Sequence, residues 1–166
     1  FYNGRISTSF SALNESWNGT SWTEVGDTNV STIRSGSAGS QTAALRAGGG
    51  PPYQSTTEKW DGSSWTEVND MNNARCTSGV GLQTAALMIA GEIGSAPAGY
   101  RSSNTENWDG TSWTELADQN VTTNFSNNFG TQNLAMDFAG NGPAPSKIST
   151  TEFWDGTSWT ETGDLS

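Results

Sequence analysis

The chain of 166 residues has no histidine, a single cysteine and no run of about 18 apolar residues. The lack of histidine removes the commonest general base and the commonest metal ligand. The single Cys76 excludes an intrachain disulfide, and we expect a small buried residue there. The lack of a long apolar run excludes a transmembrane helix, so we expect no insertion into a membrane. Because the chain starts at Phe1 without a signal peptide, we expect a processed start or a piece of a longer polypeptide.

Basic residues are also few: 7 Lys and Arg stand against 17 Asp and Glu, which gives a formal net charge of −10. A surface of this charge repels phosphate backbones, so we expect no nucleic-acid partner. The acidic residues are spread along the chain rather than gathered in a run, which favours a solubilising surface over a cation site. Only 32% of the residues are hydrophobic, but the eight tryptophans argue against disorder. This balance favours many short strands and turns.

Two phrases recur along the chain. The first reads Trp-Asp-Gly-Thr-Ser-Trp-Thr-Glu or a close variant, occurs four times and contains all eight tryptophans. Its copies begin at Trp17, Trp60, Trp108 and Trp154, so they are 43, 48 and 46 residues apart. The second reads Gln-Thr-Ala-Ala-Leu twice and Gln-Asn-Leu-Ala-Met once, and Ala-Gly follows shortly after each copy. A period of this length with several short strands is typical of a β-propeller blade.

The sequence therefore predicts an all-β chain of propeller blades with four antiparallel strands each. The small apolar second phrase, such as Gln83–Ala90, is expected to be an inner strand, and the Asp-Gly turn of the first phrase joins two outer strands. The single repeat domain 1–166 then divides into a partial blade (1–24), three blades (about 25–67, 68–115 and 116–161) and a tail (162–166). About three and a half blades leave a face uncovered. We therefore expect further blades of the same polypeptide, or other copies of the chain, as partners.

The order of these features resembles the kelch repeat family. The matching positions in the best-preserved copy are Gly48-Gly49, Glu58, Trp60 with Trp65, and Arg75. Three departures indicate a divergent branch: the tryptophans are closer together, the glycine doublet decays, and the arginine before the inner strand is lost from one copy. The decayed doublets are Gly91-Glu92 and Gly140-Asn141, and the arginine positions are Arg34, Arg75 and, where it is lost, near Asn124. Repeats of this kind are similar to tail-fibre or surface proteins of marine bacteriophages and bacteria, which implies an extracellular or virion-surface location.

The repeated side chains are expected to be structural. Paired tryptophans can stack on sugar rings, but a binding site needs one or two pairs, whereas this pair recurs in every copy. We therefore expect cross-strand packing and filling of the wedge between blades. The eight structural positions are Trp17, Trp22, Trp60, Trp65, Trp108, Trp113, Trp154 and Trp159. The turn residues Asp61, Asp109 and Asp155 are expected to accept backbone N–H groups, and no calcium-loop spacing surrounds them, so we expect no metal and no cofactor.

Catalysis is the weaker interpretation. Some kelch-fold relatives are copper oxidases that use histidines and a tyrosine joined to a cysteine, and a chain without histidine cannot take over that activity. A two-carboxylate glycosidase is possible in principle, but every candidate carboxylate recurs in each repeat. The sequence thus favours a protein that is not an enzyme.

We predict a non-enzymatic module of a virion or cell surface that recognises a host-surface glycan or protein through its variable loops. The candidate contacts are Tyr53, Tyr100, Arg101 and Lys147, because each departs from the repeat pattern. One alternative is a purely structural protein that decorates a particle or forms filaments. A weaker alternative is a fragment of a carbohydrate-active enzyme.

Overall fold

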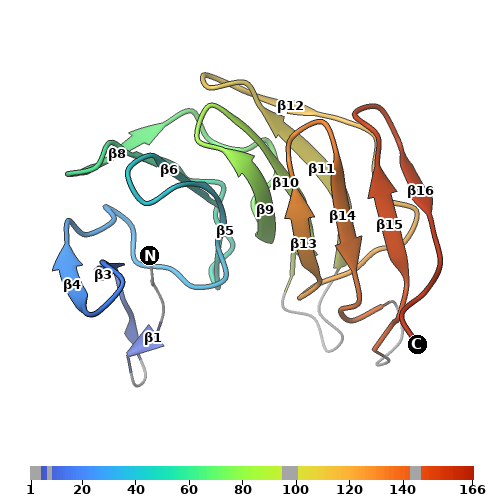
Figure 1. Ribbon diagram of the computed structural model, residues 1–166, viewed down its shortest axis with the longest axis horizontal. Helices are drawn as coiled ribbons and strands as arrows, with labels where there is room; N and C mark the ends of the chain where they lie inside the picture. Colours follow the sequence, from blue (N-terminus) through green and yellow to red (C-terminus); the bar gives the residue numbers. More distant parts are fainter. Residues whose placement is uncertain (1–4, 7–8, 95–100, 143–146) are drawn as a thin grey trace.

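The computed structural model describes residues 5–6, 9–94, 101–142 and 147–166 (Figure 1). Within them the chain forms short strands and no helix, so nothing described there could cross a membrane as a helix.

Three four-stranded antiparallel sheets follow one another along the chain, and each is one blade. Blade 2 consists of β5 (Gly36–Gly39), β6 (Ala44–Ala47), β7 (Thr57–Trp60) and β8 (Trp65–Val68). Blade 3 consists of β9 (Cys76–Leu82), β10 (Ala85–Glu92), β11 (Arg101–Trp108) and β12 (Trp113–Glu115). Blade 4 consists of β13 (Asn127–Gly130), β14 (Ala135–Phe138), β15 (Thr151–Trp154) and β16 (Trp159–Glu161). Strand order follows chain order in each sheet, which confirms the prediction of an all-β chain with blades of four antiparallel strands.

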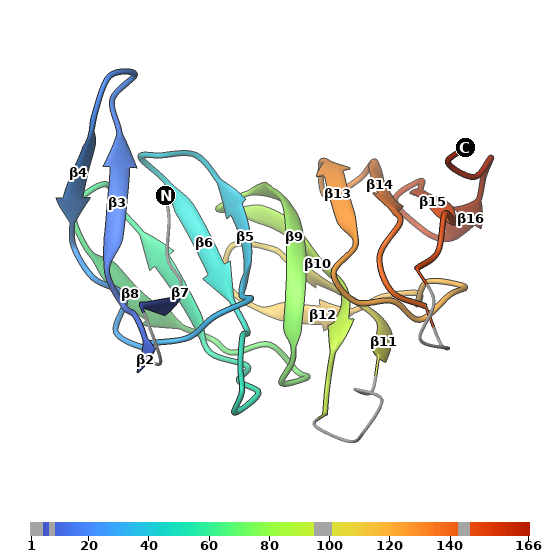
Figure 2. The same cartoon turned by 90° about the horizontal axis from the view of Figure 1, so that it is seen from below.

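The N-terminal part is half a blade. Strands β3 (Asn14–Trp17) and β4 (Trp22–Val25) pair with each other, and β1 (Arg5–Ile6) and β2 (Ser9–Phe10) form a separate short hairpin. Trp17 lies opposite Trp22 as Trp60 lies opposite Trp65, so β3 and β4 are the third and fourth strands of blade 1. Figures 1 and 2 both show the blades side by side, with β3 and β4 at one end of the array and β15 and β16 at the other.

Apolar side chains are buried between consecutive blades rather than inside one sheet. The cluster between blades 2 and 3 contains Leu45, Ala47, Met71, Ala86, Met88, Trp108 and Trp113. The cluster between blades 3 and 4 contains Val80, Leu87, Ile89, Ala90, Ala135, Trp154 and Trp159. Each blade thus covers one face of its predecessor, which is why a single repeat cannot bury its own core.

The tight turn between the first and second strands of a blade needs glycine. Gly39, Gly81 and Gly130 occupy this turn with φ of +102°, +105° and +131°. A Cβ at any of them would overlap a backbone carbonyl oxygen four residues later. Only glycine tolerates this combination without strain, so the glycine before each recurring glutamine is set by backbone geometry.

Two assignments made from the kelch resemblance are wrong in register. Gly48 and Ala139 occupy the same position of the repeat. The Gly48 N–H donates to Thr56 O and the Ala139 N–H donates to Thr150 O. Gly48 and Ala139 also both have positive φ, +69° and +61°. The glycine doublet of blade 4 is therefore replaced by Ala139-Gly140 rather than by Gly140-Asn141. By the same alignment Ala90-Gly91 replaces it in blade 3, with Ala90 at φ +50°.

The second misplaced assignment is Arg34. Gly39 pairs with Ala44 as Gly81 pairs with Ala86, and this register places Ile33, not Arg34, at the position of Arg75. Arg34 instead matches Cys76. The sequence could not settle this, because a one-residue shift in a short irregular loop leaves the surrounding pattern unchanged.

Candidate functional site

The recurring glutamates join consecutive blades. In each case the carboxylate accepts the backbone N–H and side-chain amide of an asparagine from the loop that precedes the blade. The three pairs are Asn29 with Glu58, Asn72 with Glu106, and Asn120 with Glu152. The glutamate side chains are buried, so these charge-assisted bonds lie away from water. They are part of the scaffold and leave no carboxylate oxygen pointing to a ligand.

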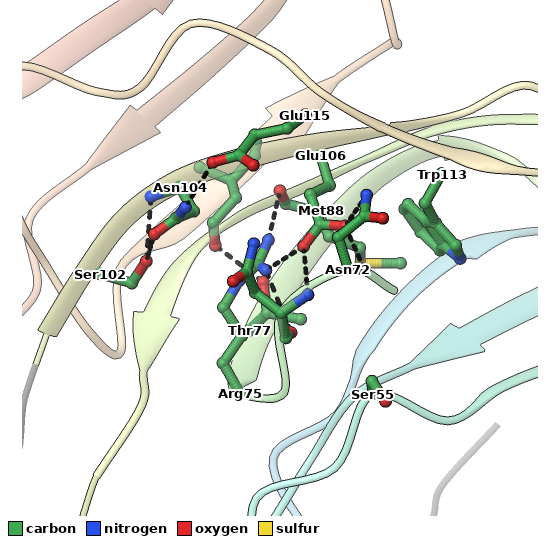
Figure 3. A network of polar contacts seen from close by, with 12 residues as sticks. Ser55, Asn72, Arg75, Thr77, Met88, Ser102, Asn104, Glu106, Trp113 and Glu115 are labelled. Carbon is green, nitrogen blue, oxygen red and sulfur yellow. Dashed lines mark hydrogen bonds and ion pairs between the residues drawn. The ribbon is translucent and has the colours of Figure 1, made fainter. Parts of the chain in front are cut away.

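Arg75 adds an ion pair to this arrangement in blade 3 (Figure 3). Its fully buried guanidinium contacts the Glu106 carboxylate and donates to Ala90 O at 3.0 Å and Met88 O at 3.3 Å. Every contact in this set is internal, so Arg75 is a structural residue.

The tryptophan pairs have one geometry in all four blades. Their ring centroids are 5.1–5.5 Å apart and their planes are inclined by 43–44°. The pairs of blades 2 to 4 are buried, whereas Trp17 and Trp22 of the half-blade are 42% and 52% exposed. The indoles of blades 3 and 4 are packed against the preceding blade, whereas Trp65 of blade 2 borders a hollow beside the half-blade.

The Asp-Gly turns form closed local hydrogen-bond sets. Asp61 Oδ1 accepts the backbone N–H groups of Ser63 and Ser64 at 2.8 and 2.9 Å, and the Ser63 hydroxyl donates to it as well. The Ser63 hydroxyl and then the Ser64 N–H lower the pKa of Asp61 to about 2. Asp109 and Asp155 accept the equivalent backbone bonds, and their pKa values are lowered for that reason. In the described residues, no three Cys, Asp or Glu side chains cluster as a metal site would require.

A pocket of about 220 Å³ lies where the first strands of blades 2, 3 and 4 begin. One repeat position lines it three times, as Arg34, Cys76 and Phe125. The Arg34 guanidinium lies 4.9 Å from the centre of the half-exposed Phe125 ring. The other lining residues are Thr77, Ser78, Gly91, Glu92, Asn124 and Ser126. The backbone of this repeat position is thus equivalent in the three blades, whereas its side chain differs from blade to blade.

Glu92 is the polar centre of this pocket. It pairs with Arg34 at 3.5 Å and accepts from Asn124 Nδ2 at 3.4 Å. The Tyr53 hydroxyl donates to the other carboxylate oxygen and lies 2.7 Å from Gly94 O. The loop after β6 thus brings Tyr53 from blade 2 to a carboxylate of blade 3.

The cysteine in the pocket wall is a poor nucleophile. Burial and, to a smaller extent, the Glu92 carboxylate raise the pKa of the Cys76 thiol to about 11, and Arg34 opposes this rise. A thiol with this pKa is protonated at neutral pH, and the thiolate is the reactive form. The pocket therefore offers a carboxylate, a guanidinium and an aromatic ring, which suit binding through hydrogen bonds and ring contact.

The predicted contact residues are only partly brought together. Tyr53 reaches the pocket through Glu92, whereas Arg101 lies opposite Glu92 in the register of β10 and β11 without lining the pocket. Lys147 is exposed on the loop before β15 of blade 4, away from the pocket lining, and Tyr100 lies outside the described residues.

Sequence reasoning missed the role of Glu92, Arg34 and Phe125. A usable signal was present: once the register is correct, the position of Arg34, Cys76 and Phe125 holds a different chemical type in every blade. Comparing repeats position by position would have selected it, because scaffold positions stay constant.

A larger hollow of about 520 Å³ lies between the half-blade and blade 2. Its walls include Asn14 and Trp17 of β3 and Ala38 and Arg46 of blade 2. In blades 2 to 4 the third strand pairs with a second strand, whereas β3 pairs only with β4 among the described residues. The hollow thus occupies the place of the two inner strands of blade 1, and we interpret it as an incomplete blade contact.

No family model matches the chain, and no curated protein matches it. Among 130 matching chains of solved structures, the protein YjhT superposes with a TM-score of 0.73 at 10% sequence identity. The match covers 92% of this chain and 52% of YjhT, so this chain spans about half the length of that structure. At this identity the likeness shows the fold alone. Together with the four-stranded sheets described above, it identifies the chain as an all-β array of propeller-like blades.

Proposed function

We propose that the chain is a non-enzymatic recognition module that binds a glycan of a host surface in the pocket at the start of β5, β9 and β13. The observation that carries this proposal is the one repeat position that becomes Arg34, Cys76 and Phe125 where three blades converge. A constant scaffold with variable side chains at its strand ends is the usual arrangement of a binding surface.

The chemistry of the pocket supports a sugar-sized ligand. An exposed aromatic ring such as Phe125 can pack on the apolar face of a sugar, and Glu92 and Arg34 can accept from and donate to its hydroxyl groups. The volume of about 220 Å³ is below the range of about 300–1,000 Å³ of drug-sized sites. It therefore suits one sugar ring at the end of a longer glycan.

Binding without catalysis is favoured by the same residues. Glycoside hydrolysis needs two carboxyl groups flanking the bond, whereas Glu92 is the one carboxylate in the described lining of the pocket. The raised pKa of Cys76 also disfavours a thiolate mechanism. We extend the proposal to a divergent kelch-like protein on a virion or cell surface, on the strength of the repeat phrases.

A glycan array probed with the labelled chain tests this proposal. We expect binding to a subset of glycans that share a terminal sugar. Phe125→Ala and Arg34→Ala should each weaken that binding about 10-fold or more, because truncation of a central contact commonly costs over 1 kcal/mol.

Lys147→Ala is the matched control, since this exposed cation lies outside the pocket lining. Binding that is lost in Lys147→Ala but kept in Arg34→Ala would place the site on the blade 4 loop instead. An array with no bound glycan would contradict the glycan part of the proposal.

A further inference from the structure

The two ends of the blade array carry the two halves of a contact that its interior contains twice. We propose that the chain associates head to tail with a second copy of itself, with Trp22 of one copy packed against Thr151 of the next. This inference concerns the faces of the blades and does not depend on glycan binding.

The interior contact joins the fourth strand of one blade to the third strand of the blade before it. Trp113 Nε1 donates to Thr57 Oγ1 at 3.1 Å, and Trp159 Nε1 donates to Thr105 Oγ1 at 2.9 Å. Both threonines are completely buried, and the two tryptophans are 8% and 6% exposed. The second tryptophan of each repeat thus inserts into the preceding blade and finds a hydroxyl there.

Blade 4 presents the threonine half of this contact, and no blade covers it among the described residues. Thr151 opens β15 as Thr57 opens β7, and its buried Oγ1 has no hydrogen-bond partner among the described residues. An unsatisfied buried hydroxyl is unfavourable and indicates a missing donor. Leu165 lies six residues after Trp159 as Met71 lies six after Trp65, yet Leu165 is 50% exposed where Met71 is 4% exposed.

The half-blade presents the tryptophan half. Trp22 opens β4 as Trp113 opens β12. Trp22 is nevertheless 52% exposed, because no described blade precedes it. One end of the chain therefore offers an indole, and the other offers the hydroxyl and apolar side chain that receive an indole elsewhere in the same molecule.

A second copy is the occupant that fits both ends. Figures 1 and 2 place β4 and β15 at opposite ends of the array, so Trp22 cannot reach Thr151 within one chain. The contact is heterologous and makes a ring if it closes or a longer series if it does not. Since this chain spans 52% of the similar solved structure, two copies supply about as much chain as that structure contains.

The contact is small and opposed by charge. Among the described residues blade 1 contributes β3 and β4, which would cover the outer strands of blade 4. A limited interface of this kind gives weak association. The contact itself is uncharged, whereas two copies of net charge −10 repel each other. We therefore expect association to strengthen as salt rises, because salt screens the repulsion.

Sedimentation velocity of the chain over about 1–200 µM, at low and high salt, tests the inference. We expect dimers or larger species with a dissociation constant of about 10–100 µM. Trp22→Phe and Thr151→Val should each weaken association, by about 10-fold or more for the tryptophan and about 5-fold for the hydroxyl. Near-UV circular dichroism confirms that each variant is folded, and Thr66→Val, at an exposed threonine of β8, is the matched control.

A mixture of the two variants gives the sharper test. Trp22→Phe keeps a native Thr151 and Thr151→Val keeps a native Trp22, so one intact contact per pair remains and the mixture should form dimers and nothing larger. A chain that stays monomeric at all concentrations overturns the proposal. Association that both variants leave unchanged, or a mixture that grows beyond dimers, also overturns it.

Discussion

One repeat position beside the recurring glutamates carries a different chemistry in each blade. Opposite Glu58, Glu106 and Glu152 the second strands place Arg46, Met88 and Asp137. Arg46 supplies the cation for Glu58 at 3.1 Å, and Arg75 supplies it for Glu106 from the preceding loop. In blade 4 a second carboxyl lies opposite the glutamate. The pKa of Asp137 is raised to about 6: burial is the main cause, the hydrogen bond from Gln119 opposes the rise, and the Glu152 carboxylate contributes to it.

We expect Asp137→Asn to stabilise the chain at pH 7.5 by about 1–2 kcal/mol. The folded-state pKa of about 6 is above the ordinary value of about 3.9, so the folded protein binds this proton more tightly than the unfolded chain. The stability contributed by Asp137 is complete below about pH 4 and is lost as the pH rises through about 6. Asparagine removes the charge and keeps an oxygen for the Gln119 amide.

Urea unfolding at pH 4 and pH 7.5 measures this effect. The increase in the free energy of unfolding of Asp137→Asn should be present at pH 7.5 and much smaller at pH 4, where the native Asp137 carboxyl is already protonated. Asp27→Asn is the control, because Asp27 is exposed. An equal gain at both pH values would show that the charge of Asp137 is not its cause.

The hairpin between the third and fourth strands is the most local element of the repeat. In blade 1 Asn18 Oδ1 accepts the N–H groups of Thr20 and Ser21, as Asp61 Oδ1 accepts those of Ser63 and Ser64 in blade 2. The turn thus requires an acceptor oxygen at this position and tolerates either side chain.

We expect Asp61→Asn to unfold at nearly the native urea midpoint at pH 7 and Asp61→Ala to unfold at a lower one, because alanine removes the acceptor. The pKa of Asp61 in the folded chain, about 2, is below the ordinary aspartate pKa of about 3.9. The Asp61 carboxylate therefore stabilises the folded chain fully above about pH 4, and this stabilisation is lost as the pH falls toward 2. Asp61→Asn should lack this acid loss. Carboxyl chemical shifts across an acid titration give the pKa directly, and a value near 4 would contradict the hydrogen-bond account.

At this scale the sequence predicted well what is local. The Asp-Gly turn, the tryptophan pair and the inner strand around Ala85–Glu92 follow from turn chemistry and apolar pattern. The glycine doublet and the arginine before the inner strand were misplaced by one residue, as Ala90 and Ile33 show. Ala90 and Ala139 have positive φ near the end of the second strand, and the residue preference of alanine does not predict this conformation.

The whole molecule is a linear series of blades whose buried apolar clusters lie between neighbouring blades. The same type of side chain should therefore contribute differently to the free energy of unfolding in an interior blade and in an end blade. Trp113 is buried and donates to both Thr57 Oγ1 and Asn69 O, whereas Trp22 is half exposed at the end.

We expect Trp113→Phe to lower the free energy of unfolding by about 2–3 kcal/mol, because it removes buried surface and leaves two acceptors without their donor. Trp22→Phe should cost below about 0.5 kcal/mol, as a surface change does. Urea unfolding followed by circular dichroism, at a protein concentration below that of self-association, compares the two. Equal costs would show that the half-blade is covered in the isolated chain.

By itself the sequence determined the all-β fold, the four-stranded blade and the structural place of the paired tryptophans, because strand, turn and pair all form within one repeat. Only the tertiary structure decided which side chains of different repeats come together. Arg34, Cys76 and Phe125 belong to three repeats and meet only where three first strands converge, and Glu92 gains its role from Tyr53 of another blade. Likewise nothing in the sequence distinguishes Thr151. Its hydroxyl lacks a partner within the described ranges, and this is significant only by comparison with the Trp113 and Trp159 contacts. Contacts between blades depend on register and on stacking, which residue order along one repeat does not specify.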